Sequence, residues 1–351
     1  EYQSSYNFGF VDPYWTMDGV SLGYSVFYNK TDYDDANYDI TSYSVDTLGA
    51  GVRIGYPISE TSSLNYGLTA SQDSLSSGTY TVPSILEFMA NNGGDYTEAD
   101  FTNVKASIGW GESTLNRGIL PNRGYSQSVT LQTTVPAASD LEFYKLDYRG
   151  QHFTPLSKQT ALRLHTELGY GDGFGDTDGL PFYENYFAGG ISSVRGFRNG
   201  SLGPRAVASL AFPNISSNPN QLPNYDPVTG IYQCNPATGI CTDPDQDDQP
   251  FGGNVMITGG VDYLFPLPFI KDQSSLRTTF FVDVGNVFST NCDDFQVDCN
   301  SPDLGDLAVS TGFGLTWITA MGPLGFAIAT PIKEPDNSDP QFFQFTLGQT
   351  F

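Results

Sequence analysis

The sequence predicts an all-β fold, a transmembrane antiparallel β-barrel, and three observations support this prediction. Apolar and polar residues alternate with a period of two along most of the 351 residues, which is typical of strands with one apolar face. Glycine and proline are frequent, at 38 and 22 residues, and the aromatic residues are mostly tyrosine (21) and phenylalanine (25). No apolar run approaches the roughly 18 consecutive residues that a membrane-spanning helix needs.

The charge of the chain excludes other classes of protein. There are 39 acidic and 15 basic residues, which give a formal charge of −24. No basic surface is available to neutralise nucleic-acid phosphates, so we expect no nucleic-acid partner. The aromatic content of 14% argues against disorder in spite of the net charge.

Predicted strands follow one another along the whole chain. Near the C-terminus, for example, Phe343, Phe345 and Leu347 lie on one face of a strand and polar residues lie between them. The same pattern predicts about thirteen strands of about 10–14 residues. In chain order they lie at 2–12, 20–30, 43–57, 63–74, 101–112, 125–135, 142–156, 160–172, 255–265, 276–288, 307–317, 324–329 and 343–351.

The polar face of these strands carries charged residues. A soluble sandwich keeps such residues outside, whereas a transmembrane barrel turns its apolar face to lipid and its polar face to a wet lumen. Periodicity alone does not separate the two, but the strand lengths and the aromatic residues near strand ends favour the membrane barrel. The residues expected to face the lumen include Arg53, Lys105, Lys145, Asp147, Arg149, Arg163, His165, Glu167, Asp262, Arg277 and Asp283.

Short turns and long polar loops alternate between the strands, as they do in outer-membrane barrels. The short connections include 57–60, 121–124, 155–158 and 320–323, and the long ones include 31–42, 75–100, 171–254 and 289–305. The alternation falters only at 136–141. Most aspartates fall in the long loops, which places the negative charge at the outer surface.

The four cysteines form two local pairs, Cys234 with Cys241 and Cys292 with Cys299. A zinc site would need shorter Cys-x-x-Cys spacings and usually a nearby histidine, and both histidines lie far away in the sequence. We therefore predict two disulfides that staple loops. They indicate an oxidising compartment, such as the periplasm or the cell surface.

Two motifs resemble the signatures of one superfamily. Residues 194–197 are Val-Arg-Gly-Phe, preceded by Pro-Phe-Tyr-Glu-Asn-Tyr-Phe-Ala-Gly-Gly at 181–190, and residues 281–285 fit Phe-x-Asp-x-Gly. With the aromatic end of the final strand, they resemble the superfamily of outer-membrane barrels that follow periplasmic POTRA domains. Within it they are similar to the branch that assembles other outer-membrane barrels, and the resemblance runs through essentially the whole chain.

The resemblance implies a 16-stranded barrel in the bacterial outer membrane. Residues 1–351 would be the C-terminal barrel domain, and 171–254 would be its sixth outer loop, called loop 6 here, folded into the lumen. Bacterial single-chain barrels have even strand numbers, and residue 1 is interpreted as already lying inside a strand. We therefore expect about three strands and the POTRA domains to be absent from this sequence.

The resemblance also implies that the arginine of loop 6 meets acidic residues of the barrel wall. The alternation places Asp262 and Asp283 on lumen faces, and a guanidinium can donate to two carboxylates at once. We hypothesise that this contact pins loop 6 inside the barrel, either as a structural lock or as a moving part. The predicted lock residues are Val194, Arg195, Gly196, Phe197, Asp262, Phe281, Asp283 and Gly285.

The final strand carries a second hypothesis. Such a strand occurs in every outer-membrane barrel, so it could serve only the assembly of this chain itself. The resemblance implies instead a weak seam with the first strand, where client strands add to an exposed edge by β-augmentation. Gly348 would weaken the seam because it has no side chain to pack. The predicted seam residues are Phe343, Phe345, Leu347, Gly348 and Phe351.

The predicted function is an outer-membrane assembly factor that inserts β-barrel proteins without making or breaking a bond. No nucleophile and base are paired in the sequence, so we expect no enzyme, cofactor or metal site, and His165 is interpreted as a polar wall residue. The implied partners are unfolded β-barrel clients, accessory lipoproteins, and outer-membrane lipid with lipopolysaccharide. The alternatives are a two-partner-type polypeptide secretion pore of the same superfamily and a passive porin.

Overall fold

The structure is a computed structural model of the chain. It describes residues 3–32, 43–78, 81–206, 233–234, 241–242, 248–267, 270, 275–292, 296–297, 299, 302–336 and 338–348. Among these residues, no helix is long and apolar enough to cross a membrane.

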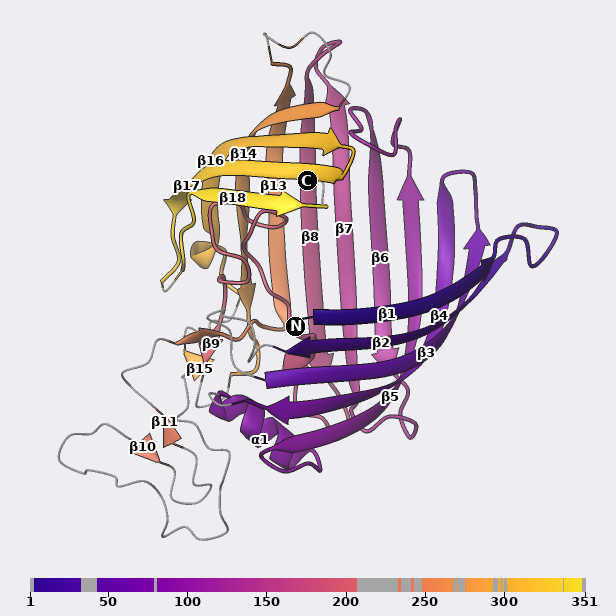
Figure 1. Cartoon of the computed structure of the whole chain (residues 1–351), viewed down its shortest axis with the longest axis vertical. Helices are drawn as coiled ribbons and strands as arrows, with labels where there is room; N and C mark the ends of the chain where they lie inside the picture. The colour runs from indigo at the N-terminus through magenta and orange to yellow at the C-terminus, as the bar shows by residue number, and fades with distance from the viewer. Residues whose placement is uncertain are drawn as a thin grey trace.

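A single antiparallel sheet of thirteen strands dominates the fold, as the alternation predicts. Each strand pairs with its neighbour in the sequence, except that small loop strands intervene between β8 and β13 and between β14 and β16. Figure 1 shows this sheet curling round toward itself. The strands are β1 (Gln3–Asp12), β2 (Ser21–Asp32), β3 (Tyr43–Pro57), β4 (Ser62–Ser77), β5 (Glu98–Ser113), β6 (Gly124–Thr134), β7 (Phe143–Pro155), β8 (Ala161–Gly173), β13 (Val255–Phe265), β14 (Leu276–Phe288), β16 (Ala308–Thr319), β17 (Gly322–Lys333) and β18 (Phe343–Leu347).

The two faces of the sheet differ as expected for a barrel in lipid. On β14, Phe281 and Asp283 point inward and are fully buried, whereas Phe280 and Val282 point outward and are exposed. On β18, Phe343 and Phe345 are exposed and Gln344 between them is buried. The inward polar face is therefore the lumen wall, and the outward apolar face is the lipid surface.

The strands β1 and β18 are the two edges of the sheet. Among the described residues, β1 pairs with β2 alone and β18 pairs with β17 alone. Figure 1 shows β1 in indigo and β18 in yellow as separate strands. The ladder between β17 and β18 covers only five residue pairs, from Ile328 opposite Phe343 to Leu324 opposite Leu347.

The connection at 75–100 contains a helix that the sequence analysis did not predict, α1 (Pro83–Asn91). Proline stands at the start of this helix, where its missing N–H is not needed, and Ile85 and Met89 follow at helical spacing. Both side chains are fully buried in an apolar cluster with Phe101, Phe143 and other residues. The helix thus covers the long-loop end of the barrel, next to loop 6 (Figure 1).

Short elements complete the loops. Loop 6 contains the 3-10 helix η1 (Phe182–Glu184) and the two-residue strands β9 (Arg205–Ala206), β10 (Gln233–Cys234), β11 (Cys241–Thr242) and β12 (Gln249–Pro250). The connection 289–305, called loop 7 here, contains β15 (Gln296–Val297), and η3 (Leu304–Asp306) spans its end. Strand β9 pairs with both β12 and β15, so a three-stranded sheet joins loop 6 to loop 7.

Candidate functional site

Loop 6 returns into the lumen after leaving β8. Its two arms are held together by main-chain pairing of Tyr186 with Gly253 and of Ala188 with Leu202. Between these pairs the chain carries the Val-Arg-Gly-Phe motif to the barrel wall, where Val194 is fully buried in an apolar cluster with Val287 of β14. The part of loop 6 that carries the motif is therefore packed in the interior.

Arg195 lies against two carboxylates of the wall. Its Nε donates to Asp283 Oδ2 at 2.7 Å, and its Nη2 donates to Asp283 Oδ1 at 2.8 Å and to Asp262 Oδ1 at 2.6 Å. The main-chain N–H of Arg195 also donates to Asp283 Oδ2 at 3.1 Å. The side chain of Arg195 is 3% exposed, and both aspartates are fully buried. The structure thus brings together the three residues that the sequence hypothesis groups.

Other wall residues complete the surroundings of Arg195. Its guanidinium carbon lies 3.6 Å from the ring centre of Phe281, and the hydroxyl of Ser310 on β16 donates to its carbonyl oxygen. Arg163 Nη1 lies 3.1 Å from Asp262 Oδ2, and His165 lies between the two carboxylates, with Nδ1 3.5 Å from Asp262 Oδ2. The two arginines balance the two carboxylates in charge, which a buried cluster requires.

The two carboxylates that pair with Arg195 keep its guanidinium protonated. Burial alone would lower its pKa, but Asp283 and Asp262 outweigh burial, so that the pKa of Arg195 is raised. Because the guanidinium stays protonated, pH does not switch this contact through the arginine.

Two predicted glycines have a physical reason at these positions. Gly196 has φ +95°, and a Cβ there would lie 3.0 Å from the Cβ of Ala329 and 3.2 Å from that of Ser310. Gly285 lies on β14 where a Cβ would be 2.8 Å from the carbonyl oxygen of Ile257. A side chain at Gly196 would therefore strain the backbone and push the motif off the wall. Phe197 is fully buried beside this contact.

A second anchor of loop 6 was missed by the sequence analysis. The carboxylate of Glu184 in η1 lies 2.5 Å from Lys105 Nζ on β5 and 3.2 Å from Lys145 Nζ on β7. Lys145 also donates to the carbonyl oxygen of Glu184 at 2.7 Å. Nearby, the hydroxyl of Tyr186 donates to Asp147 Oδ1 at 2.9 Å. Both lysines and the aspartate were expected on the lumen face, but no sequence signal paired them with loop 6.

The ionisation of Glu184 follows from this environment. Burial opposes the charged carboxylate, but Lys105 and Lys145 outweigh it and lower the pKa of Glu184. Loop 6 is therefore held at two places on the wall, at β5 and β7 through Glu184 and at β13 and β14 through Arg195.

The predicted seam residues lie on β18 or just beyond it. Phe343, Phe345 and Leu347 are exposed on the lipid face, at 53%, 53% and 58%. The ring centres of Phe345 and Phe326 on β17 lie 5.2 Å apart. Gly348 has φ +89° and follows the last ladder pair, so the chain turns out of the strand there. Phe351 lies outside the described residues.

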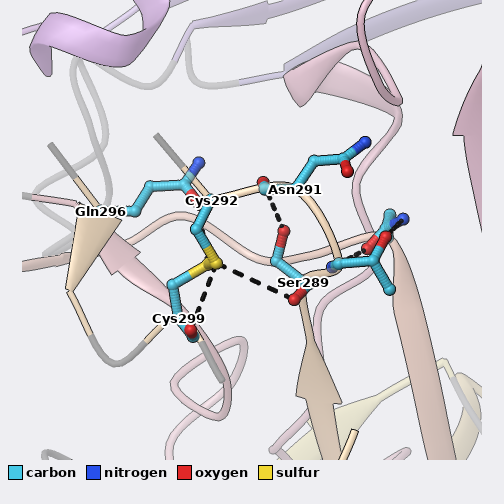
Figure 2. The surroundings of a disulfide bond; sticks show 7 residues. Ser289, Asn291, Cys292, Gln296 and Cys299 are labelled. Atoms are coloured by element: carbon cyan, nitrogen blue, oxygen red, sulfur yellow. Dashed lines mark hydrogen bonds between the residues drawn. A yellow bond between two sulfur atoms is a disulfide. The ribbon is translucent and has the colours of Figure 1, made fainter. Parts of the chain in front are cut away.

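One predicted disulfide is present, between Cys292 and Cys299 in loop 7 (Figure 2). It closes a loop of sequence separation 7 around β15, which pairs with β9 of loop 6. Beside it, the hydroxyl of Ser289 donates to the carbonyl oxygen of Asn291 at 2.8 Å. The backbones of Cys234 and Cys241 are paired directly between β10 and β11, but their side chains lie outside the described residues.

The side chains of this site form hydrogen bonds and ion pairs that position loop 6 on the barrel wall. Among the described residues, no group of three or more His, Cys, Asp or Glu is arranged to hold a metal ion. The buried charges around Arg195 are paired with one another, so the arrangement fixes loop 6 to the wall.

Comparisons with known proteins agree with this architecture. The model of the Omp85 superfamily domain matches residues 1–351. The chain is 30% identical to the outer membrane protein assembly factor BamA of Neisseria meningitidis over 97% of this chain and 41% of that protein. It is 21% identical to BamA of Nitratidesulfovibrio vulgaris over 99% of this chain and 36% of that protein.

A solved structure is similar over almost the whole chain. This is BamA from Haemophilus ducreyi lacking POTRA domains 1–3, with a TM-score of 0.79 and 29% identity, covering 99% of this chain and 62% of that one. The chain spans about two fifths of the length of the curated relatives it matches, at 41% and 36%. The chain is a β-barrel of the bacterial outer membrane and belongs to the Omp85 superfamily.

Proposed function

We propose that this barrel is the membrane part of an assembly factor that folds and inserts β-barrel proteins into the outer membrane. The observation that carries the proposal is the similarity, over nearly the whole chain, to proteins named outer membrane protein assembly factor. The clients would be unfolded outer-membrane barrels. Accessory lipoproteins and outer-membrane lipid with lipopolysaccharide would be the other partners.

The proposed mechanism uses β18 as one side of a seam. An exposed strand edge offers unpaired N–H and C=O groups, and a client strand that pairs with it gains main-chain hydrogen bonds without covalent chemistry. The short ladder between β17 and β18 supports this role, because few hydrogen bonds hold β18 to its neighbour. We further propose that loop 6, tied through Arg195 and Glu184, keeps the barrel wall in shape while the seam opens.

The test is a client-folding assay with the full-length protein and its accessory lipoproteins in liposomes. An unfolded outer-membrane porin is added, and its folding is followed by heat-modifiability on gels. We expect faster folding than in empty liposomes, and we expect Arg195→Ala to remove most of the acceleration.

No acceleration, with intact and correctly oriented proteoliposomes, would contradict the proposal. Passage of a soluble polypeptide into the same liposomes would then support a secretion pore. Steady conductance without any effect on client folding would support a porin.

A further inference from the structure

Gln344 connects the seam strand to the loop 6 motif. This residue lies on the lumen face of β18 and is 5% exposed. Its side-chain Oε1 accepts from the main-chain N–H of Gly196 at 3.1 Å, and its Nε2 donates to the carbonyl oxygen of Phe197 at 2.6 Å. One amide side chain thus satisfies a donor and an acceptor of the motif backbone.

The segment before β18 adds main-chain contacts to the same motif. The N–H of Gln341 donates to the carbonyl oxygen of Gly196 at 2.8 Å, and the N–H of Arg198 donates to that of Asp339 at 2.8 Å. Phe197 and Pro340 form an isolated antiparallel bridge. Residues 196–198 therefore bind the 339–344 segment as a short extra strand would.

The contacts between residues 339–344 and the motif add substantially to the ladder that holds β18 to β17. That ladder pairs five residues of β18 with β17, whereas 339–344 is bound to the motif by the contacts of Gln344, Gln341 and Asp339. The motif itself is fixed to β13 and β14 through Arg195. A continuous path of hydrogen bonds thus runs from Asp283 through residues 195–198 to Gln344.

We propose that Gln344 is a positioning residue that couples the Arg195 lock to the seam strand, so that each stabilises the other. The role of β18 at the seam rests on the function proposed above, but the coupling is a property of the barrel alone. If β18 moves, either the hydrogen bonds of Gln344 to the motif break or the motif moves together with β18. By linkage, the free energy by which the lock stabilises β18 equals the free energy by which β18 stabilises the lock, so weakening one of them weakens the other.

The test is amide hydrogen exchange on the full-length protein in lipid nanodiscs, with two variants made separately. Gln344→Met keeps the length of the side chain but removes its donor and acceptor. We expect faster exchange, on the order of tenfold, at the amide of Arg198, whose own acceptor is the untouched Asp339. Asp283→Asn weakens the lock, and we expect a comparable rise at the amide of Gln341 and along β18.

The matched control is Gln132→Met, on the lumen face of β6, away from residues 196–198 and β18. We expect it to leave exchange at Arg198 and Gln341 unchanged. The coupling would be wrong if the effect of Gln344→Met ended at Gly196, or if Asp283→Asn left β18 unchanged. The second variant retains Gln344, so the proposal stays testable even if Gln344→Met does not fold.

The client-folding assay separates this inference from the proposed function. Reciprocal changes in exchange in a protein that does not speed client folding would support the coupling and contradict the assembly role. Client folding at the normal rate with independent changes in exchange would support the assembly role and overturn the coupling. When both hold, we expect Gln344→Met to slow client folding in proportion to the faster exchange of Arg198.

Discussion

The contacts of the Arg195 side chain explain why this position holds an arginine. Its guanidinium bonds to Asp283 through two nitrogens and to Asp262 through one, on the ring of Phe281. A lysine offers a single ammonium and cannot reproduce this fork. The site therefore requires arginine for its geometry as well as its charge.

Removing this side chain should strongly destabilise the barrel. Arg195→Ala leaves two buried carboxylates with fewer partners, and we expect a loss of about 3–5 kcal/mol of stability. Arg195→Lys should restore only part of it. The measurement is the midpoint temperature of heat-modifiability on gels.

The control is Arg149→Ala. The Arg149 side chain is 72% exposed, and its pair with Glu167 is 3.7 Å long. Such a solvent-exposed pair contributes about 0–1 kcal/mol. Equal effects of Arg195→Ala and Arg149→Ala would contradict the prediction.

Glu184 gives the second residue-scale prediction, which concerns pH. Its pKa in the folded protein is lowered from 4.5, so its contribution to stability is complete above that value and is lost as pH falls through the folded pKa. We therefore expect wild type and Glu184→Gln to differ most in stability at neutral pH and to converge in acid. The measurement is the denaturation midpoint of both proteins between about pH 3 and 7. A constant difference over this range would argue against the anchor.

At the scale of elements, alternation in the sequence predicts most of the fold. The predicted segments 255–265 and 276–288 coincide with β13 and β14, because each strand has one face toward lipid and one toward the lumen. The alternation does not predict helix α1, because a period of two indicates strands and leaves residues 75–100 as a polar connection. Its proline and the spacing of Ile85 and Met89 were signals that could have revealed it.

The candidate site was predictable only in part. The motif around Arg195 stands out by its resemblance to a superfamily, and the alternation places Asp262 and Asp283 inside. The contacts of Glu184 and Gln344 depend on how a long loop folds back, and their partners lie 79 and 148 positions away. No periodic pattern records such distant contacts.

Loop 7 provides the element-scale prediction. Its disulfide closes a short loop around β15, and such a bond mainly restricts the unfolded chain locally. We expect Cys292→Ser combined with Cys299→Ser to speed protease cleavage within 289–302 severalfold and to leave the midpoint of the barrel almost unchanged. Limited proteolysis followed by mass spectrometry measures the first effect. Loss of the folded barrel in this double variant would contradict the prediction, because the disulfide would then stabilise more than loop 7.

At the scale of the whole molecule, loop 6 is tied to the lumen wall at two places, which lie on nearby strands of the sheet. Glu184 meets β5 and β7, and Arg195 meets β13 and β14, so the chain between them passes through the interior. A barrel filled in this way should conduct ions poorly. This is the opposite of what a passive porin requires.

Releasing both ties should open the lumen. We expect the full-length protein to be mostly closed in planar bilayers, and Arg195→Ala combined with Glu184→Ala to show frequent open events, because both ion-pair anchors of loop 6 are then removed. Each single variant should have an intermediate effect, and Arg149→Ala should behave as wild type. Steady conductance of the unchanged protein, equal to that of the double variant, would contradict this view.

The apolar cluster beneath α1 determines which residues of the protein are exposed to selection by molecules outside the cell. It closes the long-loop end of the barrel over the packed interior, so antibodies and phages in the medium meet α1 and the outer loops before they meet Arg195 or Gln344. Agents in the medium that bind the cell surface would then act on the outer loops and leave the buried contacts out of reach. We expect natural variants of this protein to diversify in the outer loops while the residues of the lock stay constant.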